Sequence, residues 1–261
     1  MKGIVKGLIW GGVIALIGVI IILITLGVNG WQIGSTKFTM NNFTAQDENT
    51  ALEIGINDGT LKTEFYDGDK VIIDYPTSDG LEARIIEENG KIIFVSDLKW
   101  YKSFFAGCRR IPETIIKLPK DVIFEISCKM NAGTIVLADG NYSNVNLDIN
   151  AGTFKTNSIS CASFTGEMSA GTLSIGEAVC NVMDCDLSAG TMNINRLTCA
   201  NTKIDMSAGT VKLAFTGEQR EYAIYTDISA GSCNVGSQAG ETDKRIDIDV
   251  SAGTVKINFG A

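Results

Sequence analysis

The sequence contains no histidine among its 261 residues. This absence excludes Ser-His-Asp and Cys-His catalysis, imidazole general bases and histidine-ligated zinc. The chain also lacks a phosphate-binding glycine loop and a dinucleotide-binding fingerprint. Carboxylate chemistry is the only simple route left to hydrolysis or elimination, so we do not expect an enzyme.

A tetrapeptide that returns at a fixed interval dominates the second half of the chain. It reads Asn-Ala-Gly-Thr twice, Ser-Ala-Gly-Thr four times and Ser-Ala-Gly-Ser once. Its glycines are Gly133, Gly152, Gly171, Gly190, Gly209, Gly231 and Gly253. Successive copies lie 19 residues apart four times and then 22 residues apart twice. A repeat this short and regular indicates one supersecondary unit stacked on copies of itself.

Apolar residues alternate with polar ones before each tetrapeptide, as at Met183, Cys185 and Leu187. This alternation indicates a β-strand with one buried face, and it predicts that the alanine of the tetrapeptide also points inward. The alternation resumes out of phase at Met192 and Ile194. The chain must therefore bend at the glycine, which reaches positive φ without steric cost. Two further phase shifts in each repeat predict a roughly three-sided coil.

These patterns predict an all-β protein preceded by one transmembrane α-helix. The expected fold is a single-stranded β-solenoid, similar to a β-helix, with coils of about 19–22 residues. Residues 126–261 form the regular repeats, residues 50–125 form irregular β coils and an end cap, and residues 29–49 form a polar stalk. The extra residues of the two longer repeats are expected in outer loops at 216–220 and 236–241.

An uncharged apolar run predicts a transmembrane helix over residues 7–28. At about 1.5 Å rise per residue it spans a hydrocarbon core of ~30 Å. A cleaved signal peptide is the alternative, but no small-x-small cleavage site stands out after the run. Lys2 and Lys6 precede the run, so the positive-inside rule places residues 1–6 in the cytoplasm and residues 29–261 outside. We expect a single-pass protein of the cell membrane.

Acidic residues recur three positions before the alanine of each repeat. This column reads Lys129, Asp148, Glu167, Asp186, Asp205, Asp227 and Asp249. Coils about 4.8 Å apart would stack it on one face, and Asp184, Asp186 and Asp205 are the best cluster for Ca²⁺, which prefers carboxylate oxygens. No other cofactor is expected. A solvated stripe that discourages sheet pairing and a site of the polysaccharide-lyase kind are the alternatives.

The part that follows the apolar run is acidic, with 20 Lys and Arg against 30 Asp and Glu. This balance disfavours nucleic acid and anionic lipid as partners. The chain has seven cysteines, of which Cys161, Cys180 and Cys199 occupy the same position in three successive repeats. Buried free thiols are the simplest interpretation. A disulfide from Cys180 to either neighbour is the alternative.

One segment breaks the repeat and combines aromatic with cationic side chains. Its residues are Trp100, Tyr101, Phe104, Phe105, Arg109 and Arg110. The aromatic rings either plug the open end of the core as a cap or belong to an exposed loop. Such a loop would contact the membrane interface or a partner protein, because aromatic residues flanked by Lys and Arg suit both.

The repeated Ala-Gly-Thr coils resemble a bacterial family of candidate adhesins built from β-strand repeats. The Leu118-Pro119-Lys120 entry into the coil at 122–130 and the single N-terminal anchor resemble that family too. The resemblance covers about residues 50–259. It implies the β-solenoid fold and a place at the cell surface, and it supplies no catalytic residues.

We therefore expect a non-enzymatic, adhesin-like surface interaction module. The membrane is one expected partner, through the N-terminal helix, and an unidentified protein or glycan is the other. One alternative is an envelope-stress or signalling accessory that binds a membrane partner. A second alternative is a carboxylate-dependent carbohydrate-active enzyme of the β-helix type.

Overall fold

The structure, a computed structural model, describes residues 37–99 and 111–260. All of these except Lys37 fall in one compact unit. The predicted all-β class is confirmed for this part of the chain, whose strands form one curled, 16-stranded sheet. The predicted transmembrane segment at 7–28 lies outside the described residues. Within them, no helix has the length and apolar character needed to cross a membrane.

The strands are short near the N-terminus and longer, with bends, further along the chain. The first eight are β1 (Thr39–Thr44), β2 (Ala51–Ile56), β3 (Thr60–Tyr66), β4 (Ile72–Thr77), β5 (Leu81–Glu88), β6 (Lys91–Leu98), β7 (Thr114–Pro119) and β8 (Phe124–Met130). The others are β9 (Thr134–Val136), β10 (Gly140–Ile149), β11 (Thr153–Met168), β12 (Thr172–Leu187), β13 (Thr191–Met206), β14 (Thr210–Phe215), β15 (Tyr222–Cys233) and β16 (Lys244–Phe259), with a 3₁₀ turn η2 at Gln219–Glu221.

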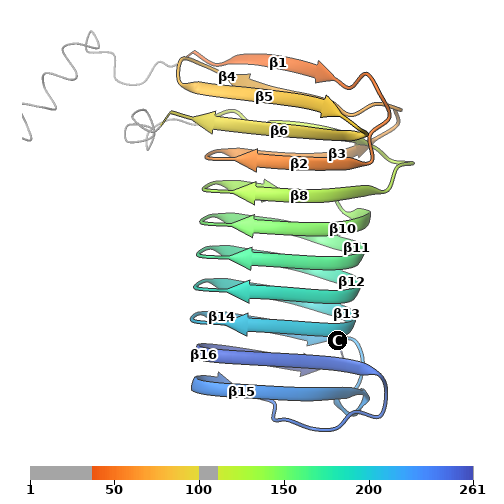
Figure 1. Ribbon diagram of the computed structural model, residues 1–261, viewed down its shortest axis with the longest axis vertical. Helices are drawn as coiled ribbons and strands as arrows, with labels where there is room; N and C mark the ends of the chain where they lie inside the picture. The colour runs from red at the N-terminus through yellow and green to blue at the C-terminus, as the bar shows by residue number, and fades with distance from the viewer. Residues whose placement is uncertain (1–36, 100–110, 261) are drawn as a thin grey trace, which may run out of the picture. The chain divides into compact units, whose positions relative to one another are not determined.

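The repeats stack as parallel strands in register. Asp148 pairs with Glu167, Glu167 with Asp186, and Asp186 with Asp205, so each residue lies beside the equivalent residue of the next repeat. Figure 1 shows β8, β10, β11, β12 and β13 following one another in this way. The arrangement is solenoid-like, because the side chain at each position of one coil lies over its equivalent in the next.

Burial follows the predicted inward columns. Phe164, Met183 and Thr202 are each buried, as are their equivalents in the other coils. Between β11 and β12 the pairing skips Asn157 and again Ala162, and at both places the alternation of buried side chains changes phase. Together with the tetrapeptide turn, this coil has three changes of phase, as the sequence predicts.

The prediction that the alanine points inward is wrong. Ala170 and Ala189 are exposed at the outer edge of the turn, and Ser169 and Ser188 before them are exposed too. The strand ends at Met168 in β11, two residues before the alanine. Beyond that point the backbone turns, so the alternation of a pleated strand no longer decides which way a side chain faces.

The glycine of the turn is required both by its dihedral angle and by the coil beside it. Gly171 has φ of +136°, and a Cβ added there would lie 2.4 Å from the carbonyl oxygen of Gly152. The glycines with positive φ at this turn are Gly133, Gly152, Gly171, Gly190, Gly209 and Gly253. Gly231 differs, because it lies inside the edge strand β15 without a positive φ.

The coils at both ends do not stack in chain order. The C-terminal strand β16 lies between β13 and β14 on one side and β15 on the other. At the opposite end, β2 lies between β6 and β8, and β3 lies between β7 and β9. Figure 1 shows β16 above β15 and β2 between β6 and β8. The first and last segments of the repeat region are therefore enclosed by others.

Antiparallel strands close the N-terminal end. β5 pairs with β6, and β1 pairs with β4, which in turn pairs with β7. β1 falls within residues 29–49, which the sequence predicts as a polar stalk. Asn42 donates a hydrogen bond to Asp74, and Phe43 packs against the core, so residues 39–44 belong to the folded unit. This segment contains too few apolar residues to show the alternation that marks a strand in the sequence.

A loop covers the edge strand at the other end. The backbone of Gln238 exchanges two hydrogen bonds of 2.9 Å with that of Ile224 in β15. The side-chain amide of Asn234 donates a hydrogen bond to the carbonyl oxygen of Ile257 at 2.6 Å. Gln238, in the predicted outer loop of the last repeat, thus pairs with backbone groups that an uncovered edge would leave free.

The carboxylate of Glu87 links the antiparallel hairpin of β5 and β6 to the segment that follows β1. Glu87 accepts hydrogen bonds from the backbone N–H groups of Gln46 and Asp47, each at 2.9 Å, and from Asn49 at 2.7 Å. Burial by itself would raise the pKa of Glu87, but these donors favour the ionised form and the net pKa is lowered. Asp139 is held in the same way by the N–H groups of Asn157 and Ser158, with a lowered pKa despite partial burial.

We expect the free energy of unfolding to fall as the pH is lowered below about 4.5, the ordinary pKa of a glutamate. Because Glu87 and Asp139 have lowered pKa values when folded, the unfolded chain takes up protons first, and their contribution is lost as pH falls through the folded values. Urea unfolding between pH 7 and pH 3 measures this slope. An equal slope in the Glu87→Gln, Asp139→Asn double variant would contradict the assignment.

Candidate functional site

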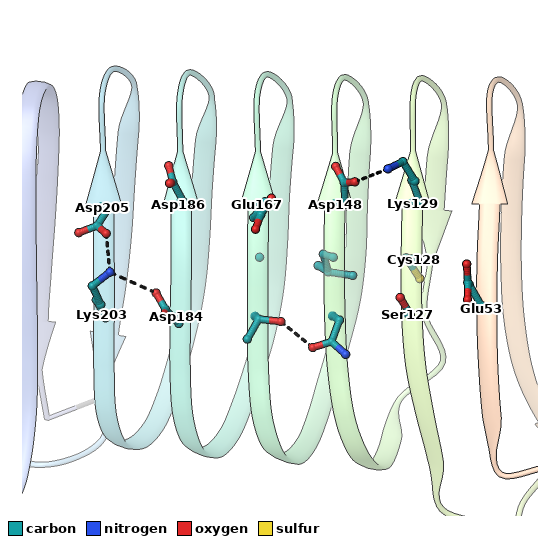
Figure 2. A pocket seen from close by; sticks show the side chains of 14 residues that line it. Glu53, Ser127, Cys128, Lys129, Asp148, Glu167, Asp184, Asp186, Lys203 and Asp205 are labelled. Carbon is teal, nitrogen blue, oxygen red and sulfur yellow. Dashed lines mark hydrogen bonds and ion pairs between the residues drawn. The ribbon is translucent and has the colours of Figure 1, made fainter. Parts of the chain in front are cut away.

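The outward side chains just before the tetrapeptide turns line a groove on one side of the stack. We call this side the front face. The groove has a volume of about 660 Å³. Its lining residues are Glu53, Ser127, Cys128, Lys129, Asn146, Leu147, Asp148, Thr165, Gly166, Glu167, Asp184, Asp186, Lys203 and Asp205. Figure 2 shows the labelled side chains side by side on successive coils.

Two lysines balance part of the negative charge of the front face. Nζ of Lys129 lies 2.9 Å from a carboxylate oxygen of Asp148. Nζ of Lys203 lies 2.5 Å from Asp205 and 3.9 Å from Asp184. The hydrogen bond to Asp205 is the main reason that the pKa of Lys203 is raised. These groups are exposed to solvent, so each pair adds little to stability.

Two carboxylates in the middle of the groove form no ion pair with any residue that the structure describes. Glu167 and Asp186 lie in register on β11 and β12, between the two lysine pairs, and both are exposed. Two unit charges at about 5 Å repel each other by less than 1 kcal/mol in water. The fold therefore tolerates this arrangement at little cost, and the two carboxylates stay open to a positively charged partner.

The proposed calcium ligands Asp184, Asp186 and Asp205 do lie on neighbouring strands of the front face. Lys203 stands between Asp184 and Asp205 and contacts both, as Figure 2 shows. Within residues 37–99 and 111–260, no three carboxylate or thiol groups gather closely enough to hold a metal ion. Binding of Ca²⁺ stays a prediction from the sequence.

The opposite side of the stack, which we call the back face, carries no carboxylates in its repeats. It is formed by the segments that follow the turns, at 134–138, 153–157, 172–176, 191–195, 210–214 and 254–258. Their outward residues are mainly Thr, Asn and Lys. Lys155, Lys212 and Lys256 are exposed, and Lys212 pairs in register with Lys256. Charge is therefore sorted between the two faces.

Sequence reasoning missed the back face, although its signal is present. The lysines recur four residues after the alanine of the repeat, at Lys155, Lys212 and Lys256. Only three of the regular repeats carry a lysine there, whereas six of seven carry an acid in the front column. The predicted interaction segment at 100–110 lies outside the described residues, so Trp100, Tyr101, Phe104, Phe105, Arg109 and Arg110 remain a prediction.

Several solved structures are similar to the chain. A candidate adhesin from Bacteroides fragilis has a TM-score of 0.53 at 13% identity, covering 85% of this chain and 98% of that protein. A candidate adhesin from Parabacteroides merdae is 11% identical, with 86% and 97% covered and a TM-score of 0.47. A candidate lipid-binding protein from Parabacteroides distasonis is 10% identical, with 85% and 96% covered and a TM-score of 0.40. The likeness to the Bacteroides fragilis protein, with a TM-score above 0.5, concerns the fold alone.

A search among curated proteins finds no match to the chain. A family model does match, over residues 49–258, which run from before β2 to the penultimate residue of β16. The matched region begins within two residues of the start predicted from the repeats. The chain therefore belongs to the Toastrack DUF4097 family.

Proposed function

We propose that the protein is a non-enzymatic surface interaction module that binds a cationic partner through its front face. The observation that carries this proposal is the sorting of charge between the two faces. Glu167 and Asp186 have no ion-pair partner among the described residues, while the back face carries Lys155, Lys212 and Lys256 and no carboxylate in its repeats. A surface whose only role is solubility does not require acidic and basic side chains to lie on separate faces.

The geometry of the stack suits a repeated, extended partner. Carboxylates on β10, β11, β12 and β13 lie in register, about 4.8 Å apart from coil to coil. Each contact with a cation is worth about 1 kcal/mol or less in water. Several contacts along a rigid face add up, and their sum weakens as salt screens them. A basic protein segment is the kind of partner that meets this spacing.

We place this module outside the cell, held by the apolar segment at 7–28. The cations before that segment support a cytoplasmic N-terminus. If the domain is exposed, a labelled lysine peptide will bind intact cells that produce the chain. Binding seen only after the cells are permeabilised would overturn this location.

Neutralising the front face is expected to weaken binding of an eight-lysine peptide at least tenfold. The test variant is Glu167→Gln, Asp186→Asn, and the matched control is Asp121→Asn, Asp243→Asn, which removes the same charge from exposed sites outside the strands. Titration of the full chain in a non-ionic detergent measures the Kd. We expect the difference between the variants to shrink as salt screens the charges.

Equal Kd values for the two variants at low salt would rule out the front face as the binding surface. Tight binding that neither variant weakens would place the binding surface outside the front face. Turnover of a polysaccharide that is lost in Asp186→Asn, Asp205→Asn would support the enzyme alternative. The peptide experiment and the turnover assay use the same purified chain, so their outcomes can be compared directly.

A further inference from the structure

Three cysteines form a column in the core of the stack. Cys161 on β11 pairs in register with Cys180 on β12, which pairs in register with Cys199 on β13. All three are free thiols, with side chains 9%, 6% and 3% exposed. Neighbouring parallel strands lie about 4.8 Å apart. That separation falls inside the range of about 4.4–6.8 Å between Cα atoms that disulfides span.

Cys180 and Cys199, the two cysteines nearest the C-terminal end of the column, lie opposite each other on paired strands. The thiol of Cys199 donates a hydrogen bond to the carbonyl oxygen of Asn201, at 3.1 Å. A disulfide between Cys180 and Cys199 would therefore join two residues that are already neighbours and leave the strands in place.

The two neighbouring sulfurs differ in acidity. The adjacent Cys180 lowers the pKa of Cys199 to about 7, against the effect of burial, and the adjacent Cys199 raises the pKa of Cys180. Burial raises the pKa of Cys161 to about 11 and that of Cys128 to about 12. Because thiolates react with oxidants and thiols do not, we expect Cys199 to be the first of these sulfurs to be oxidised at neutral pH.

We propose that Cys180 and Cys199 are an oxidation site, at which a peroxide joins strands β12 and β13 by a disulfide. In the first step the thiolate of Cys199 attacks one oxygen of hydrogen peroxide, the O–O bond breaks, and a sulfenic acid and hydroxide form. In the second step the sulfur of Cys180 attacks the sulfur of the sulfenic acid and loses its proton. The S–S bond forms and water leaves, so two thiols lose two electrons and the peroxide gains them.

Cys161 provides an internal test of this assignment, because it flanks Cys180 on the other side. If Cys199 is replaced, the only in-register partner left for Cys180 is Cys161. The sulfur of Cys161 has the higher pKa, so we expect the replacement disulfide to form more slowly. Cys185, on the same strand as Cys180, pairs in register with Gly166 and Ile204 and has no cysteine beside it.

The experiment treats the folded full chain, in detergent at pH 7, with hydrogen peroxide, and then blocks the remaining thiols with iodoacetamide. Trypsin cuts after Lys155, Arg196 and Lys203, so the proposed bond joins peptide 156–196 to peptide 197–203. Mass spectrometry should find this joined pair lighter by two hydrogens than the sum of its parts. Fragmentation should place the bond at Cys180.

In Cys199→Ala the joined pair should disappear, and a bond between Cys161 and Cys180 should form within peptide 156–196 at least tenfold more slowly. Cys128→Ala is the control and should oxidise like the unaltered chain. The unaltered chain alone decides the proposal if a variant does not fold. The proposal is overturned if all three thiols are blocked after peroxide treatment, if Cys199 reaches sulfinic acid unjoined, or if the bond joins other cysteines.

Discussion

Replacing Gly171 by alanine is expected to lower the free energy of unfolding by roughly 3 kcal/mol. Two effects act together at this turn. The backbone has φ of +136°, which an L-residue with a side chain rarely adopts, and the new Cβ would lie 2.4 Å from the carbonyl oxygen of Gly152. Because the oxygen belongs to the neighbouring coil, the strain cannot be relieved by rotating a side chain.

Two further glycines separate these effects. Gly236 has no positive φ, and no atom lies within 4 Å of the place that a Cβ would take, so Gly236→Ala should change stability by less than about 0.5 kcal/mol. Gly90 has φ of +73° but only one atom, at 4.0 Å, near such a Cβ. Gly90→Ala should therefore cost only the dihedral part, about 1 kcal/mol. Urea unfolding of all three variants gives the comparison, and equal losses at Gly171 and Gly236 would contradict the account of the turn.

Removing residues 244–261 is expected to abolish cooperative folding of the C-terminal half of the stack. This deletion takes away β16, which pairs with β13, β14 and β15. The buried side chains lost with it are Ile246, Ile248, Val250, Val255 and Ile257. At about 1.5–3 kcal/mol for each, the lost burial amounts to roughly 10 kcal/mol, which is as large as the net stability of a typical domain.

The matched control keeps β16 and changes only its outer surface. Asp249→Asn and Lys256→Gln alter exposed residues of the same strand and should shift the unfolding midpoint little. Hydrogen exchange followed by mass spectrometry locates the damage. We expect lost protection in β13, β14 and β15 and retained protection in β10. Full protection of β15 in the shortened chain would show that β16 is dispensable.

The sequence predicts the facing of side chains well, because alternation follows directly from the geometry of a strand. The inward column that contains Phe164 and Met183 is an example, and so is the bend at Gly171. Alternation says nothing about what happens once a strand has ended. This is why it wrongly predicts Ala170 in the core, whereas the residue is exposed.

The order of the coils could not be predicted for a related physical reason. A period of 19–22 residues fixes which residues of two coils lie side by side if the coils are neighbours, but all coils carry the same pattern. Thr254 can therefore pair with Thr210 as well as with Ser232, and in the structure it lies between them. The back face was missed because Lys155 and Lys212 are separated by coils without lysine, so the column looks incomplete until the strands are placed.

The enclosure of the first and last coils restricts how such a protein can change in length. A new repeat added after β16 would have no free neighbour, because β15 already occupies that side. A repeat duplicated among β10, β11, β12 and β13 would instead fit between two parallel strands, because each of these strands can pair in register with any copy of the unit. Relatives with longer or shorter stacks should therefore differ in the number of 19-residue units in the middle, while both closed ends stay the same.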